Sequence, residues 1–223
     1  MGKHINLNTS GTHCIGAYLA EPNGKPKGGI VVVQEIFGVN AHIRSVADGF
    51  AAHGFTAIAP AFFDHIESDL ELRYDPADYD KGRALVTEVG MDRAVEDVAS
   101  AAESINSAGK IGVVGYCWGG TVAFVSAIRL GLPAVSYYGG RNLAYLSERP
   151  KAPVMFHFGE TDKSIPPEAV RKHREALPEM AVYTYPGAGH AFNRDVDPAY
   201  FRAESAKLAL QRTLAFFDKH LAA

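Results

Sequence analysis

The sequence has few cysteines, little net charge and no long apolar run. Only Cys14 and Cys117 among the 223 residues are cysteines, too few for a disulfide framework, which favours a reducing compartment. The formal net charge of -3 leaves no basic excess, so we expect no nucleic-acid partner and no membrane partner. Neither a signal peptide nor a run of roughly 18 apolar residues, as a membrane span requires, is found. We therefore expect a cytoplasmic protein that acts on small molecules.

Repeats, low-complexity segments and linkers are also missing, and we predict one domain over residues 1–223. After a hairpin within residues 5–19, β-branched apolar runs alternate with segments of helical periodicity. This alternation predicts a mostly parallel, doubly wound α/β sheet flanked by helices. The expected strands are 29–35, 55–59, 111–114, 134–138, 154–158 and 181–185. The expected helices are 43–51, 91–105, 121–128, one after Pro166-Pro167, and a final one carrying residues 210–221.

Two stretches bear on access to a site. Only about fifteen residues separate the strands 134–138 and 154–158, too few for a helical lid domain. Residues 62–80 are rich in acidic and aromatic residues, and we expect an irregular segment there that forms the rim of a pocket.

The sequence Gly115-Tyr116-Cys117-Trp118-Gly119 lies between an expected strand and an expected helix. Small residues two before and two after a nucleophile allow the tight turn that exposes its side chain, as in the nucleophile elbow of the α/β-hydrolase fold. A helix N-terminus also favours the thiolate form of a cysteine. The pattern predicts that Cys117 is a nucleophile, whereas a free cysteine elsewhere is more often a buried structural thiol.

A cysteine nucleophile needs a histidine base and an acid that orients it, in the chain order nucleophile, acid, histidine. Among the later histidines, only His190 follows an expected strand on a glycine-rich loop. Asp162 follows the strand 154–158, with Glu160 as the rival acid, and we favour the shorter Asp162. Backbone N–H groups of Trp118 and Ile36 are the expected oxyanion donors.

Four segments together resemble the dienelactone hydrolase family: residues 34–40 (QEIFGVN), 115–120 (GYCWGG), Asp162, and 189–194 (GHAFNR). The resemblance covers most of the chain and implies an α/β-hydrolase fold with carboxymethylenebutenolidase-like activity, in which water opens a dienelactone to maleylacetate during the degradation of aromatic compounds. It implies a triad of Cys117, Asp162 and His190. It also implies that Glu35 helps to generate the thiolate when substrate binds, although a carboxylate at a strand end is more often part of an ion pair.

The resemblance further implies that arginines bind the substrate carboxylate, one of them Arg194. A guanidinium suits this task because it can form two parallel hydrogen bonds to a carboxylate. The family's second arginine has no clear match, with Arg83 and Arg73 nearby and Tyr79 closer to the expected place. The expected partner is therefore a small anionic lactone or ester, with no cofactor and no metal, on a monomer or small homo-oligomer.

The leaving group determines the expected reaction. A lactone or enol ester releases a stabilised enolate, so attack by a thiolate suffices and gives a thioester acyl-enzyme. A broader carboxylesterase or thioesterase with the same triad is one alternative, and a small-ligand receptor that does not catalyse is another.

Overall fold

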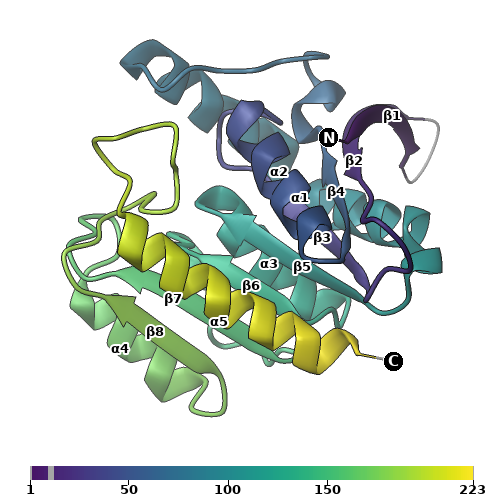
Figure 1. Cartoon of the computed structure of the whole chain (residues 1–223). Helices are drawn as coiled ribbons and strands as arrows, with labels where there is room; N and C mark the ends of the chain where they lie inside the picture. Colours follow the sequence, from purple (N-terminus) through teal and green to yellow (C-terminus); the bar gives the residue numbers. More distant parts are fainter. Residues whose placement is uncertain (1, 10–12, 223) are drawn as a thin grey trace. The chain divides into compact units, whose positions relative to one another are not determined.

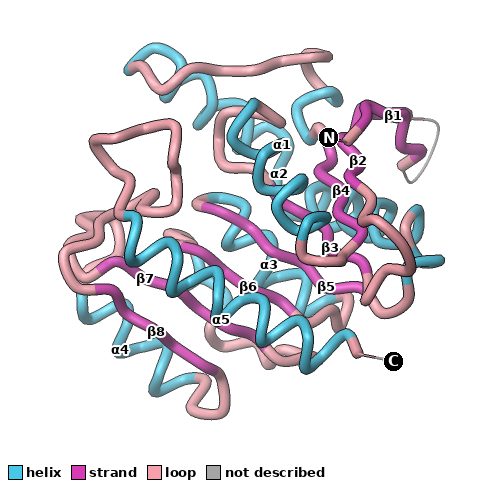
Figure 2. Tube along the Cα trace, in the orientation of Figure 1, coloured by secondary structure: helices cyan, strands magenta, loops and turns pink. Residues whose placement is uncertain are grey.

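The computed structural model describes residues 2–9 and 13–222 and contains one eight-stranded sheet in the order β1-β2-β4-β3-β5-β6-β7-β8. Figures 1 and 2 show the strands and the five α-helices of the described chain. The β1–β2 and β2–β4 ladders are antiparallel, whereas the β3–β4, β6–β7 and β7–β8 ladders are parallel. The sheet is mostly parallel, and the predicted α/β-hydrolase architecture is confirmed. The chain forms two compact units, Met1–Val113 with Leu221–Ala223 and Val114–His220, and each is described by itself.

The first unit begins with the predicted hairpin and continues with two parallel strands that are buried along their whole length. Complete burial explains why these two strands read as continuous apolar runs rather than as alternating ones. Its elements are β1 (Lys3–Asn8), β2 (Cys14–Ala20), β3 (Gly29–Val33), α1 (Ala41–Ala52), β4 (Thr56–Pro60), the 3-10 helix η1 (Phe62–His65), α2 (Pro76–Ser104) and the 3-10 helix η2 (Asn106–Ala108).

Helix α1 forms where the periodicity predicts it. The side chain of Asn40 caps its first turn by accepting a hydrogen bond from the backbone N–H of Ile43 at 3.2 Å. Its apolar face, which includes Ile43, Ala47 and Phe50, is buried. Gly54 follows the helix at a φ of 95°, a left-handed conformation that glycine adopts without steric cost.

Helix α2 corrects the expectation of an irregular segment over residues 62–80. Phe62–His65 is a 3-10 helix, and α2 begins at Pro76, so only the residues between about 66 and 75 are irregular. Asp75 caps the helix by accepting from the N–H of Asp78 at 3.1 Å, and Pro76 occupies the first turn, where its missing N–H costs nothing. Acidic and aromatic residues in the first turns hide the apolar periodicity, while Gly90, at a φ of 72°, kinks the helix.

The second unit is built around a helix that is buried from Trp118 to Ile128. Its elements are the end of β5 (Ile111–Tyr116), α3 (Trp118–Arg129), β6 (Ala134–Tyr137), the 3-10 helix η3 (Asn142–Tyr145), β7 (Val154–Gly159), α4 (Pro167–Ala176), β8 (Ala181–Tyr185) and most of α5 (Ala203–Leu221). Between β6 and β7 the chain contains only η3, so the predicted absence of a lid domain at this place is confirmed.

Parallel pairing brings the carboxyl ends of three strands in this unit to one edge. Tyr137 of β6 pairs with His157 of β7, and Gly159 at the end of β7 pairs with Tyr185 at the end of β8. The loops that leave these strands carry Asp162 and His190. Within the described chain, no helix is both long and apolar enough to cross a membrane.

Candidate active site

Cys117 lies in the predicted strand-to-helix turn, between β5 and α3. Its φ of 57° and ψ of -116° place a non-glycine residue in a rarely populated backbone region, the kind of strain that accompanies functional turns. A Cβ atom on Gly115 would collide with the carbonyl oxygen of Gly119, so the turn requires glycine there. The N–H of Cys117 donates to the carbonyl oxygen of Tyr137 at 3.0 Å, which ties the turn to β6.

The side chains of His190 and Asp162 meet in the same unit. Nδ1 of His190 lies 2.7 Å from Oδ2 of Asp162, whose side chain is fully buried. The other carboxylate oxygen of Asp162 accepts from the N–H of Ser164 at 2.8 Å, which fixes the orientation of the carboxylate. The rival acid Glu160 is exposed to solvent. A Cβ atom on Gly159 would collide with the carbonyl oxygen of Ala188, so a glycine lets the two loops approach.

The protonation of His190 depends on its two partners. Burial alone lowers the pKa of its imidazole. The charge of Cys117 and hydrogen bonds to Asp162 and Cys117 outweigh burial and raise the pKa to about 10. Because Nδ1 faces Asp162, Nε2 is the ring atom left for the sulfur of Cys117. The two side chains therefore favour the charged form of the His190 imidazole.

Tyr138 is a residue of this site that the sequence did not reveal. It follows β6 at a φ of 40°, and its N–H donates to the carbonyl oxygen of His157 at 2.8 Å. Its buried ring lies 5.1 Å from the ring of His190 and 5.4 Å from that of Phe192. An aromatic residue at the carboxyl end of a strand is a weak signal, since core packing explains it equally well.

Two other histidines of the second unit, His157 and His173, are buried and contact neighbouring core residues. His157 is fully buried, with Nδ1 2.7 Å from the hydroxyl of Tyr185 and Nε2 3.1 Å from that of Thr213. Burial lowers its pKa to about 3, so its ring stays neutral. His173 of α4 lies with Nδ1 2.7 Å from the carbonyl oxygen of Ala169, one helical turn earlier. Both side chains are therefore held by contacts of their own, and the choice of His190 as the base stays a prediction.

Arg194 lies in the loop between β8 and α5, four residues after His190. Its side chain is only 1% exposed, and Nη1 donates to Oδ2 of Asp197 at 3.2 Å. Its guanidinium carbon is 5.7 Å from the centre of the Tyr200 ring. Asp197 was not singled out in the sequence, although its position three residues after the arginine was an available signal.

Glu35 and Ile36 belong to the first unit and lie in the loop that follows β3. The predicted strand 29–35 ends earlier than expected, at Val33, so both residues lie in the loop. Both are buried, at 1% and 7% exposure. The carbonyl oxygen of Phe37 accepts from the N–H of Leu72 at 2.9 Å, and a Cβ atom on Gly82 would collide with the carbonyl oxygen of Ile36. The backbone of this loop is therefore closely covered by the segment before α2 and by its first turns.

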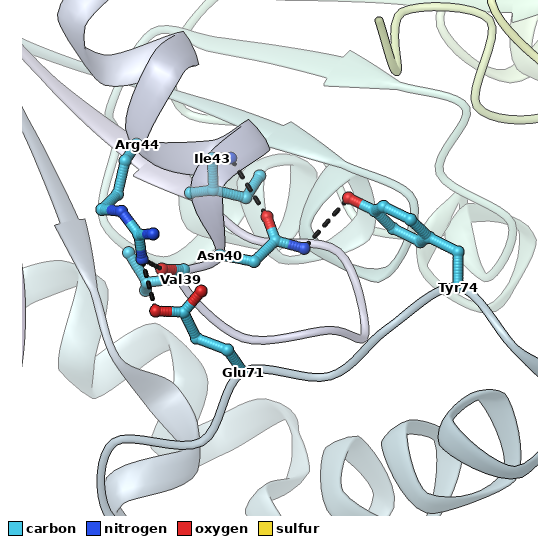
Figure 3. Close-up of polar contacts among 6 residues, drawn as sticks. All are labelled: Val39, Asn40, Ile43, Arg44, Glu71 and Tyr74. Atoms are coloured by element: carbon cyan, nitrogen blue, oxygen red, sulfur yellow. Dashed lines mark hydrogen bonds and ion pairs between the residues drawn. The ribbon is translucent and has the colours of Figure 1, made fainter. Parts of the chain in front are cut away.

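Side chains complete the attachment of the same loop, as Figure 3 shows. One guanidinium nitrogen of Arg44 donates to the carbonyl oxygen of Val39 and to the carboxylate of Glu71, both at 2.6 Å. Asn40, which caps α1, also donates from Nδ2 to the hydroxyl of Tyr74 at 3.0 Å. These contacts join the loop after β3 to the segment that leads into α2.

The remaining predicted residues are placed as follows. Trp118 is the first residue of α3 and is buried, while Arg83 is exposed on α2 in the first unit. Arg73 is exposed too and pairs with Asp75 and Asp78 at 3.3 and 3.5 Å. Within residues 2–9 and 13–222, no cluster of three or more histidine, cysteine, aspartate or glutamate side chains is placed to hold a metal ion.

Comparisons with known proteins identify the family. The model of the dienelactone hydrolase family matches residues 15–221. Carboxymethylenebutenolidase from Pseudomonas putida is 33% identical over 225 residues, which cover 95% of this chain and 94% of that protein. An Azospirillum brasilense protein provisionally named carboxymethylenebutenolidase is 36% identical over 219 residues, covering 92% of this chain and 93% of its own.

A solved structure points to the same family as these two relatives. A Klebsiella pneumoniae protein provisionally named a dienelactone hydrolase superposes with a TM-score of 0.87 at 30% identity, covering 99% of each chain. The chain is thus a carboxymethylenebutenolidase-like hydrolase that acts on esters, and it belongs to the dienelactone hydrolase family.

Proposed function

We propose that the protein opens a carboxylated lactone or enol ester, of the dienelactone type, through a triad of Cys117, His190 and Asp162. The observation that carries the proposal is the position of His190, hydrogen-bonded to Asp162 at 2.7 Å and to the sulfur of Cys117. The names of the relatives supply the substrate class.

The first half-reaction transfers the acyl group to sulfur. The thiolate of Cys117 forms a bond to the carbonyl carbon, and the carbonyl electron pair moves to oxygen. The N–H groups of Trp118 and Ile36 are the proposed donors to this oxyanion; helix α3 starts at Trp118, where backbone N–H groups lack helical partners. The intermediate then collapses, the bond to the ring oxygen breaks, and its electron pair leaves with the enolate.

The second half-reaction uses a change in His190. Formation of the thioester removes the charge on Cys117, which is the largest cause that raises the pKa of His190. The imidazolium can then release its proton to the enolate product and act as a base. Water attacks the thioester and gives a proton to His190, the carbon–sulfur bond breaks, and the carboxylic acid leaves. Asp162 stabilises the charged imidazole at both stages.

The substrate carboxylate is proposed to bind at Arg194, and Glu35 to assist in forming the thiolate. A buried guanidinium gives selectivity for anionic substrates, because a desolvated charge interacts strongly with its ligand. Arg83 is the proposed second carboxylate ligand, and its side chain is exposed on α2. Activity of this kind would serve the breakdown of aromatic compounds.

The test follows the loss of dienelactone absorbance with purified wild type and Cys117→Ala. We expect the rate to fall by at least about a thousandfold, since removal of a nucleophile abolishes covalent catalysis. Cys14→Ala is the matched control, because Cys14 is the other free cysteine and lies exposed on β2. Equal rates for wild type and Cys117→Ala would refute the mechanism.

Two further results of the same assay would replace the proposed substrate. A kcat/KM for nitrophenyl acetate above that for dienelactone would identify a broader esterase. Binding of the lactone by wild type and Cys117→Ala without turnover by either would identify a receptor.

A further inference from the structure

The loop between β8 and α5, drawn in yellow-green in Figure 1, contains Arg194. The N–H of Arg194 donates to the carbonyl oxygen of Ala191 at 2.9 Å, and the N–H of Asp197 to that of Arg194 at 3.2 Å. The N–H groups of Tyr200 and Phe201 both donate to the carbonyl oxygen of Asp197, at 3.1 and 2.9 Å. These consecutive turns hold the carboxylate of Asp197 against the guanidinium.

The two paired side chains differ in exposure. The side chain of Arg194 is 1% exposed, and that of Asp197 is 17% exposed. A cation withdrawn from water needs a compensating anion, and the carboxylate of Asp197 supplies one. Because Asp197 reaches solvent and Arg194 does not, the aspartate is the partner that can move away and regain hydration.

A substrate carboxylate at Arg194 would therefore meet a guanidinium that already pairs with Asp197. We propose that Asp197 competes with the substrate carboxylate for Arg194 and so determines how strongly the enzyme prefers anionic over neutral substrates. This inference rests on the assignment of Arg194 in the proposed function. Asp197 acts through Arg194 and is a positioning residue, whose effect falls on substrate binding rather than on bond breaking.

Asp197→Asn keeps the shape of the side chain and removes its charge. We expect the KM for dienelactone to fall about five- to tenfold with kcat nearly unchanged, as expected when one close charge partner is removed. The kcat/KM for nitrophenyl acetate, a neutral ester, should stay within about twofold of wild type, since it has no carboxylate to compete. If Asp197 had a purely structural role, its substitution would change the kcat/KM values for both substrates together.

Glu204→Gln is the matched control, because it removes one negative charge from the exposed first turn of α5. It should leave both KM values unchanged. Asp197→Ser is measured in parallel, so that a folding defect of one uncharged variant does not decide the outcome. A KM for dienelactone that stays constant or rises in both Asp197 variants overturns the inference.

Arg194→Met separates this inference from the proposed function. If Arg194→Met leaves the KM for dienelactone unchanged, the carboxylate site of the proposed function is wrong and the competition falls with it. If Arg194→Met raises that KM while the Asp197 variants do not lower it, only the competition is wrong. If Arg194→Met raises it and both Asp197 variants lower it, the inference is supported.

Discussion

Replacing Cys117 by serine tests the charge coupling on which the proposed mechanism depends. The serine keeps the size of the side chain but carries a hydroxyl, which stays neutral in this pH range. The wild-type His190 has a pKa of about 10 because Cys117 and Asp162 together outweigh burial. In Cys117→Ser only the two contributions of Asp162 oppose burial, so the pKa of His190 must fall.

The size of the fall in the pKa of His190 follows from the loss of the charge of Cys117 beside its ring. An opposite charge within hydrogen-bonding reach shifts a pKa by about 1 to 3 units, each worth about 1.4 kcal/mol. We therefore expect His190 of Cys117→Ser to titrate about 1 to 3 units below the wild type.

The same shift predicts a change in stability. The folded-state pKa of His190 is raised above 6.5, so its contribution to the free energy of unfolding is complete below pH 6.5 and is lost as pH rises to about 10. In Cys117→Ser the contribution of His190 to the free energy of unfolding should be lost at a lower pH than in the wild type.

The assay is an NMR titration of histidine ring signals, with the His190 signal assigned by its absence in His190→Gln. Cys14→Ser is the control and should leave the titration unchanged, because Cys14 is exposed on β2 in the first unit. Urea unfolding of both variants across pH 6 to 10 supplies the stability measurement. A wild-type His190 pKa near 6.5, or an equal His190 pKa in wild type and Cys117→Ser, would refute the coupling of His190 to Cys117.

Three further predictions concern single contacts. Asp162→Asn should lower kcat by about 10² to 10⁴ in the dienelactone assay by losing the carboxylate that orients the imidazole, whereas Glu160→Gln should match wild type. Gly115→Ala should lower the free energy of unfolding by about 1 to 3 kcal/mol or more in urea titrations, since its Cβ would collide with Gly119; an unchanged midpoint would contradict the close packing of the turn. Asn40→Ala should lower Tm by about 2 to 4 °C through loss of about 1 kcal/mol from the helix cap, while Asn40→Asp, which keeps the accepting oxygen, should lower it less in calorimetry.

The fold could be predicted because its signals are local. Continuous apolar runs mark β3 and β4, and helical periodicity marks α1. The start of α2 was missed, although Pro76 at its first turn is an ordinary helix start, because the following turns lack a clear apolar stripe.

The site could be predicted only where chain order limits the choice. An elbow followed by an acid and a histidine leaves few candidates for Asp162 and His190, and the structure brings these two side chains together. Tyr138 and Asp197 were missed because their importance comes from contacts made in the folded chain. An aromatic residue at a strand end and an aspartate three residues after an arginine are only weak signals in a sequence, because core packing or a surface position explains them equally well.

The two units differ in what holds their proposed catalytic residues. In the second unit, backbone bonds place the elbow: the N–H of Cys117 donates to Tyr137 and that of Tyr138 to His157. Changes to the reacting side chains there should therefore alter the chemistry with little effect on the fold. In the first unit, the loop after β3 is held by side chains as well, chiefly Asn40 and Arg44 (Figure 3). Substitutions at those two positions should move Glu35 and Ile36 with the loop, so stability and the rate of acylation should fall together.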